Sequence, residues 1–251
     1  MDALQSFVAV YVLAMLRYLP VFVLAPLTPL RWAPPLVRIV LVMLLAWMTA
    51  QWATPLAVNG IAAWMSAICG ELLIGLAFGL AVMLPHAALH TAGWVIDVQA
   101  GSSAGVLFDP GSQSDTQAVF GNALMWLATV LFFVLDLHLQ LYRMLAVSVQ
   151  LVPLGRSGAH LAWDGLAALL GNSFLLGLAV VMPVMFGLLL VDVGVAYATR
   201  SMPQANVYFL ALPLKLLVAI GLLMATLPLF PALFARLYRD AFQRVPGLLG
   251  G

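Results

Sequence analysis

The stretch LLIGLAFGLAVMLPHAALHTAGWVI, residues 72–96, runs for 25 residues without an Asp, Glu, Lys or Arg. A transmembrane α-helix needs about 20 consecutive apolar residues, so this stretch is long enough to cross a bilayer. The chain has further runs of the same kind at 39–70, 116–135, 165–191 and 216–235. With an apolar segment near residues 7–30, they predict about six spanning helices.

The composition supports the same class. Of the 251 residues, 65% are hydrophobic and 8% are charged, whereas a soluble domain carries about 25% charged residues. Membrane β-strands alternate apolar and polar residues, and these runs do not. We therefore predict an all-α polytopic membrane protein with about six long, bent apolar helices arranged as helical hairpins. The net charge of +1 argues against a nucleic-acid partner, and the single cysteine, Cys69, excludes an internal disulfide.

Prolines and polar turns predict where the helices end. The proline-rich segment APLTPLRWAPPLVR, residues 25–38, separates the first two helices. The stretch 61–98 is too long for one straight span, and we expect Pro85 to kink or divide it. The expected helices cover about 7–30, 36–52, 61–98, 117–135, 137–151, 161–198 and 207–237.

The positive-inside rule does not give a consistent orientation for six alternating spans. If the loop between Arg31 and Arg38 is cytoplasmic, Arg200 also falls inside, but Arg143 and Arg156 fall outside. The arginines at 236, 239 and 244 also fall outside, against the rule. In the opposite orientation Arg31, Arg38 and Arg200 fall outside instead. Either the number of spans differs by one, or some helices are covered by protein partners instead of lipid.

Polar residues inside apolar helices are costly in lipid and are candidates for function. Glu71, Gly75 and Gly79 follow at four-residue spacing and share one helix face. The two glycines allow another backbone to approach closely, although ordinary tight packing explains the pattern equally. The charged candidates are Arg17, Glu71, Asp97, Asp136, Arg143, Asp192, Arg200 and Lys215.

Catalytic or metal chemistry has little support. His86 and His90 share a face and could meet one metal ion, but no carboxylate completes a standard motif, and two histidines at an interface is the simpler interpretation. Nucleophile, metalloprotease and nucleotide-binding motifs are missing from the sequence. Asp136 and Arg143 could neutralise one another, or, as we favour, separately cap helix ends. We therefore expect no enzyme activity, no cofactor and no metal.

A polar loop, AGSSAGVLFDPGSQSD at residues 100–115, interrupts the apolar chain. Glycines give it backbone freedom, serines make it wettable, and Val106, Leu107 and Phe108 form an apolar centre that can pack. The loop could be an external connection, a re-entrant segment beside a polar path, or a flexible gate.

Four stretches occur in the order ELLIGLAFG (71–79), VIDVQAGSSAGVLFDPGS (95–112), LVPLG (151–155) and RSMPQANVYFLALPLK (200–215). In this order the chain resembles the FliR/SctT family of type III export components over nearly its whole length. The resemblance implies a non-enzymatic, pore-forming subunit of a protein export gate in the bacterial inner membrane, within the basal body of a flagellum or an injectisome. It implies FliP-like and FliQ-like partners, an FlhB-like subunit and unfolded secreted proteins as cargo.

The resemblance also assigns roles along a single export-gate domain, residues 1–251. A plug lies in the loop at about 100–116, with Gly101, Ser102, Ser103, Gly105, Val106, Leu107, Phe108, Asp109, Pro110 and Gly111. The residues expected to pack against other subunits are Glu71, Gly75, Gly79, Asp97, Gln99, Arg200, Pro203, Gln204 and Asn206. Covering of helices by partner subunits would also account for the failed orientation test.

Two segments point to different branches of the family. The segment 107–133 favours a flagellar protein, whereas Lys215 in the PLK triplet leans toward a virulence system. Asp136, Leu137 and His138 stand where a glycine-rich turn is expected, which leaves the local geometry open. The best alternative from another class is a small secondary transporter, but such proteins usually show two related halves, and none is visible here.

Overall fold

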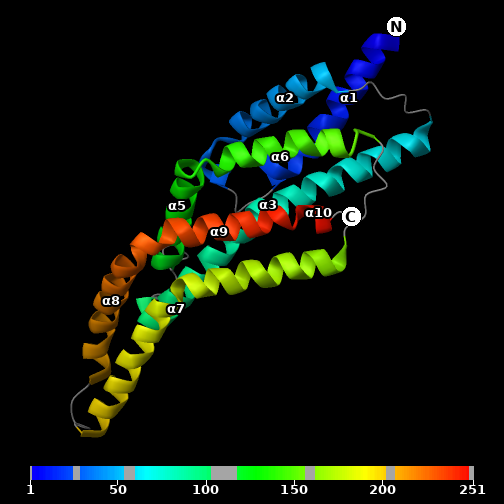
Figure 1. The fold of residues 1–251 in the computed structure, drawn as a ribbon. Coiled ribbons are helices and arrows are strands. Elements are labelled where there is room, and N and C mark those ends of the chain that lie inside the picture. Colours follow the sequence, from blue (N-terminus) through cyan, green and yellow to red (C-terminus); the bar gives the residue numbers. More distant parts are fainter. Residues whose placement is uncertain are drawn as a thin grey trace, which may run out of the picture. The chain divides into compact units, whose positions relative to one another are not determined.

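The computed structural model describes residues 2–24, 29–53, 60–102, 118–155, 162–201 and 207–248, and every regular element in these ranges is a helix (Figure 1). Five stretches within them are long and apolar enough to cross a membrane: Leu4–Val23, Pro35–Trp52, Ile61–Ala100, Trp163–Ser201 and Ala211–Gln243. The pair Val119–Val134 and Leu137–Leu151, bent by 66°, would make a sixth. The predicted all-α membrane class with long, bent helices is confirmed.

The helix ends follow the sequence signals closely, with three differences. Helix α3 (Ile61–Ala100) is continuous, so Pro85 lies inside it and does not divide it as one alternative held. The last predicted helix is instead α8 (Val207–Thr226), the 3-10 turn η5 (Leu227–Leu229) and α9 (Phe230–Gln243). The first is α1 (Asp2–Leu19) followed by the π-helical turn η1 (Pro20–Leu24).

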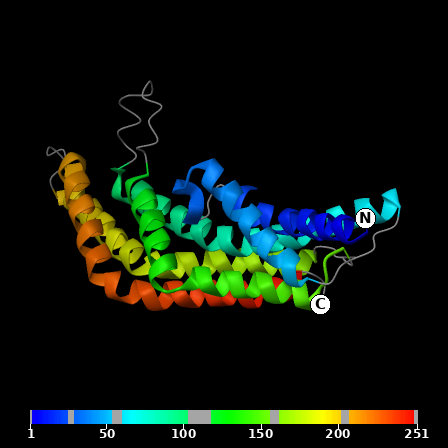
Figure 2. The ribbon, with the colours of Figure 1, turned by 90° about the horizontal axis from the view of Figure 1, so that it is seen from above.

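The chain forms two compact units, and the expected single domain remains a prediction. The first unit comprises Met1–His86, Phe132–Asn172 and Tyr238–Gly251. In it α1 packs on α2 (Pro35–Trp52), the two blue helices of Figures 1 and 2, where the Phe7 and Trp47 rings lie 5.4 Å apart edge to face. The same unit holds the larger, N-terminal part of α3, α6 (Leu137–Leu151), the start of α7 (Trp163–Ser201), the end of α9 and α10 (Val245–Leu248).

The second unit comprises Ala87–Leu131 and Ser173–Leu237. It contains the end of α3, most of α5 (Val119–Val134), most of α7, and α8. Helices α7 and α8 run side by side in Figures 1 and 2. Gly187 lies against Leu222, and Asp192, later in α7, pairs with Lys215, earlier in α8, so the two helices form an antiparallel hairpin.

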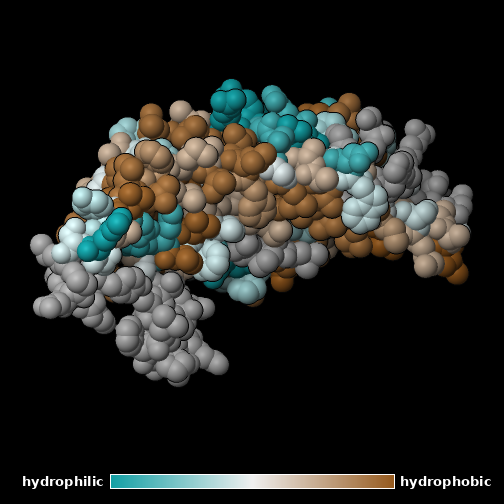
Figure 3. Space-filling model, turned by 90° about the horizontal axis from the view of Figure 1, so that it is seen from below, coloured by the Kyte–Doolittle hydropathy of each residue, from teal (hydrophilic) through white to brown (hydrophobic). Residues whose placement is uncertain are grey.

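Apolar side chains cover much of the exterior. Figure 3 shows a face made mainly of hydrophobic residues, with hydrophilic ones in a few clusters. In α2, for example, Leu36, Met48 and Trp47 are 71%, 63% and 52% exposed. Such a surface requires lipid or another protein to cover it.

Candidate functional site

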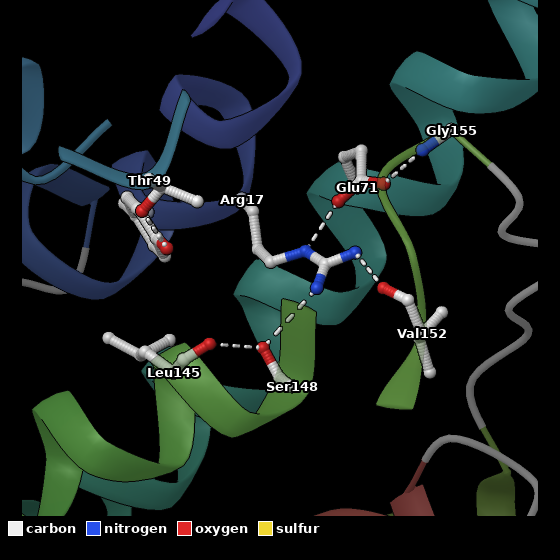
Figure 4. Close-up of polar contacts among 8 residues, drawn as sticks. Arg17, Thr49, Glu71, Leu145, Ser148, Val152 and Gly155 are labelled. Carbon is white, nitrogen blue, oxygen red and sulfur yellow. Dashed lines mark hydrogen bonds and ion pairs between the residues drawn. The ribbon is translucent and has the colours of Figure 1, made fainter. Parts of the chain in front are cut away.

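A buried ion pair joins four segments of the first unit (Figure 4). Arg17 of α1 and Glu71 of α3 are both fully buried, and the Arg17 Nε donates to Glu71 Oε2 at 2.5 Å. Arg17 also donates to the Ser148 hydroxyl of α6 at 3.3 Å and to the Val152 carbonyl at 3.0 Å. Glu71 Oε1 accepts the Gly155 backbone N–H at 2.8 Å. All three guanidinium nitrogens and both carboxylate oxygens therefore have partners.

The glycine pair next to Glu71 lies against α1 and η1. A Cβ added at Gly75 would fall within 3.0 Å of the Arg17 backbone, and one added at Gly79 would lie 3.1 Å from the Pro20 carbonyl oxygen. The predicted close approach of backbones therefore exists, and it occurs within this chain. The assignment of Glu71, Gly75 and Gly79 to subunit contacts stays a prediction.

A second polar cluster lies at the end of α3, in the other unit. Asp97 is fully buried, and its carboxylate accepts the backbone N–H groups of Phe120 at 3.1 Å and Gly121 at 2.9 Å. The Ser102 hydroxyl lies 2.8 Å from Asp97 Oδ1 and 2.9 Å from the Asp97 carbonyl oxygen. The end of α3 and the start of α5 thus meet at one carboxylate.

Lys215 of α8 adds a cation beside this cluster. Its ammonium group pairs with Asp192 of α7 and donates to the Gln99 carbonyl at 3.4 Å. The Gln99 carbonyl belongs to the last turn of α3, where a cation is favoured by the helix dipole. Gly101 ends the helix with a φ of 76°, and its N–H donates to the Val98 carbonyl at 3.2 Å. Glycine adopts this left-handed conformation without steric cost.

The remaining candidates are placed only in part. Arg200 is exposed in the last turn of α7. Gly101 and Ser102 are described above, whereas Ser103, Gly105, Val106, Leu107, Phe108, Asp109, Pro110 and Gly111 lie outside the described residues. Pro203, Gln204 and Asn206 also lie outside them. The plug and the Arg200 turn therefore remain predictions.

The prediction that Asp136 and Arg143 separately cap helix ends is wrong. Asp136 occupies the N-cap position of α6, but its side chain makes no capping hydrogen bond, and Arg143 is exposed within α6, away from its ends. Asp136 instead has a φ of 54°, so it takes the left-handed conformation that glycine would normally supply at such a turn.

His86 is buried and hydrogen-bonded to the hydroxyl of Tyr238 in α9, and this hydroxyl donates to the Val82 carbonyl at 3.1 Å. Within the described ranges, no group of three or more His, Cys, Asp or Glu residues gathers in a way that could hold a metal ion.

Sequence reasoning missed Ser148, Tyr238 and the glycines of the α3–α5 crossing. A Cβ at Gly93 would lie 2.6 Å from the Gly121 Cα. Gly93 and Gly121 are 28 positions apart and form no spacing motif, so no local signal indicated them. Ser148 and Tyr238 are ordinary surface-type residues until a distant partner, Arg17 or Val82, is known.

Comparison with known proteins decides the family. The model for bacterial export proteins, family 1, matches residues 8–241. The chain belongs to this family. The match covers both units, including Arg17, Glu71, Asp97 and Lys215.

Individual relatives extend the match. The flagellar biosynthetic protein FliR of Escherichia coli is 28% identical over 254 residues, covering 97% of this chain and 94% of the relative. FliR of Pectobacterium carotovorum is 31% identical over 181 residues, covering 71% and 69%. The secretion system apparatus protein SsaT of Salmonella typhimurium is 26% identical over 170 residues, covering 66% and 64%. As a member of the FliR/SctT family, the chain is a membrane component of a type III export apparatus.

Proposed function

We propose that this chain is a non-enzymatic, pore-forming subunit of a type III protein export gate, in a flagellar system, that passes unfolded proteins across the bacterial inner membrane. It assembles with FliP-like and FliQ-like subunits and contacts an FlhB-like subunit. The observation that carries the proposal is the size of the apolar helix surface that this chain leaves uncovered.

Helix length makes lipid alone an insufficient cover. Helix α3 has 40 residues, which at 1.5 Å per residue correspond to about 60 Å of helix. The hydrocarbon layer of a bilayer is about 30 Å thick. Helix α7 has 39 residues and presents the same excess. Apolar helix surface that extends beyond the hydrocarbon layer needs protein to cover it; this chain itself buries 61% of the apolar window of α3 but 28% of that of α7.

Two of the long helices are little buried by the rest of this chain, so their surfaces are available to partner subunits. In the apolar windows of Trp163–Ser201 and Ala211–Gln243, 28% and 11% of the residues are buried. Helix α7 carries, among others, Met182, Phe186 and Leu190 at 58%, 61% and 57% exposure. Partner helices on these surfaces would also explain why positive charge does not predict a simple orientation.

The paired charges favour a structural subunit over a secondary transporter. A transporter needs ionisable groups that can exchange a proton, ion or substrate. Arg17 and Glu71 have every polar atom of their charged groups hydrogen-bonded, and Lys215 is paired with Asp192. These charged groups hold segments of the chain together, which is the role of a structural residue and not of a transport site.

A mild-detergent purification tests the assembly. The tagged chain is expressed with its FliP-like and FliQ-like neighbours, and, as the matched control, with each neighbour omitted. We expect a complex of fixed composition in the first case and aggregation or degradation of the chain in the second. A folded, monodisperse chain without partners would contradict the proposal.

The loop at 100–116 is proposed to be the plug of this gate. Its support is chemical: Val106, Leu107 and Phe108 can exclude water and ions in a narrow pore, and the flanking glycines let the segment withdraw. Deleting residues 105–108 should raise the ion permeability of cells that make the whole complex without reducing the amount of complex. If the deletion variant assembles and its cells are no more permeable to ions than those with the parent complex, the plug proposal is wrong and the loop is an external connection.

The flagellar assignment rests on coverage. The match to Escherichia coli FliR extends over 97% of the chain, whereas the match to Salmonella SsaT extends over 66%. Complementation separates the two branches: the gene should restore motility to a flagellar export mutant and not effector secretion to an injectisome mutant. The opposite result would assign it to the virulence branch.

A further inference from the structure

Helix α5 begins with a residue that cannot cap it. The Ala118 carbonyl accepts the Asn122 N–H at 2.9 Å, which makes Ala118 the N-cap of the helix that starts at Val119. The first N–H groups of a helix have no partner inside it, and an N-cap side chain usually accepts the N–H of the second or third helical residue. The methyl group of alanine cannot do this.

Asp97 of α3 makes both of the missing hydrogen bonds. The second and third residues of α5 are Phe120 and Gly121, and Asp97 accepts their N–H groups through Oδ1 and Oδ2, at 3.1 and 2.9 Å. These are the bonds that a local Asp or Ser would make, supplied here from 23 and 24 residues away. A carboxylate at this position is also favoured by the helix dipole.

Two glycines bring the carboxylate within reach. A Cβ at Gly93 would lie 2.6 Å from the Gly121 Cα and 2.7 Å from the Phe120 carbonyl oxygen, and a Cβ at Gly121 would lie 3.1 Å from the His90 carbonyl oxygen. The backbones of α3 and α5 therefore touch where they cross, one helical turn from Asp97. Any larger residue would push the capped N–H groups away.

Ser102 completes the arrangement on the other side. Its hydroxyl lies 2.8 Å from the same Oδ1 that accepts the Phe120 N–H. The chain thus leaves α3 and enters α5 within hydrogen-bonding distance of a single, fully buried side chain.

We infer that Asp97 of α3 supplies the capping side chain that Ala118 lacks at the start of α5, and that it is a positioning residue that fixes both ends of the connection between Ser102 and Ala118. This inference rests on the proposed function for its consequence in export, because the proposed plug belongs to that connection. Its structural content is independent of the plug and can be tested separately.

The test uses the assembled, detergent-purified complex. In the Asp97→Ala variant, amide hydrogen exchange of peptides that contain Phe120 and Gly121 should accelerate by about 5–30-fold, the loss expected for an N-cap. Adding Ala118→Asp to that variant places a local cap on α5 and should restore most of the protection. Thr91→Ala is the matched control, because Thr91 is exposed on the same helix and its hydroxyl donates to the Ala87 carbonyl of its own turn.

If Asp97→Ala does not assemble, Asp97→Asn serves instead, since its single amide oxygen can accept one of the two N–H groups and should leave the other fast-exchanging. Unchanged exchange at both amides, or no rescue by Ala118→Asp, would overturn the inference. So would an Asp97→Asn complex that keeps full protection and yet loses secretion, because Asp97 would then act through its charge. Faster exchange in Asp97→Ala without any change in permeability or secretion would support the cap and show that the cap does not position the proposed plug.

Discussion

Removing one member of the Arg17–Glu71 pair should destabilise the complex far more than removing both. Arg17→Met leaves a fully buried carboxylate with the Gly155 N–H, and Glu71→Leu leaves a buried guanidinium with the Ser148 hydroxyl and the Val152 carbonyl. Breaking a buried pair in this way costs about 3–5 kcal/mol. If the two single changes acted independently, they would sum to about 6–10 kcal/mol.

The double variant Arg17→Met with Glu71→Leu should lose much less. It removes both charges and keeps most of the side-chain volume. The backbone groups that lose a partner are the Val152 carbonyl and the Gly155 N–H, at about 1–3 kcal/mol each. The expected coupling between the two sites is therefore about 4 kcal/mol, from the difference between the two sums.

Thermal unfolding of the purified complex measures this coupling. For a chain of this length, 1 kcal/mol shifts the midpoint by about 2–4 °C, so each single variant should fall by roughly 6–20 °C. The matched control is Asp240→Ala, which breaks a partly exposed pair with Arg244 one turn away and should change the midpoint by less than about 2 °C. A double variant as unstable as the sum of the singles, or singles that behave like the control, would refute the account of the pair.

Three further changes have expected outcomes. Gly75→Ala should lower the midpoint because overpacking against the α1 backbone costs about 1–3 kcal/mol, whereas Gly171→Ala, in α7 with no described atom within 4 Å, should raise it slightly. Lys215→Met should reduce complex stability by about 1 kcal/mol, and adding Asp192→Leu should restore it, with complex yield as the measure; a double variant worse than Lys215→Met would contradict the pairing. Tyr238→Phe removes the hydroxyl bond to a buried carbonyl and should cost about 1 kcal/mol, seen as a lower midpoint with unchanged subunit composition.

The helices could be predicted from the sequence because they depend on local properties. Uncharged runs and turn residues gave α2 and α6 to within one residue, and they indicated the long α3. Pro85 was harder to interpret, because a proline removes one hydrogen bond and a long apolar helix tolerates that loss when neighbours pack around it. The split of the last helix at Leu227–Leu229 had no comparably strong signal.

The site was predictable only as far as single residues. Arg17, Glu71 and Asp97 were identified as candidates because a charge in an apolar helix is costly. Their partners could not be identified, since Arg17 meets Glu71 across 54 positions and Asp97 meets Gly121 across 24. Such pairs depend on which helices cross and at which residue of each helix the crossing lies. The packing of the whole chain determines both. For Asp136 the residue was identified but its predicted role was wrong, because it is a left-handed turn residue and not a helix cap.

Contact with a protein in transit is the most direct test of the proposal that this chain forms part of the export path. A photo-crosslinking amino acid is placed at position 107, in the apolar centre of the loop, and, as the control, at Leu217 of α8, which is 67% exposed on the apolar exterior. Export is then stalled with a substrate that carries a folded block at its C-terminal end. We predict a crosslink to the stalled substrate from position 107 and none from position 217. Equal crosslinking from both positions, or none from position 107 while the stalled substrate occupies the complex, would contradict the pore-forming role.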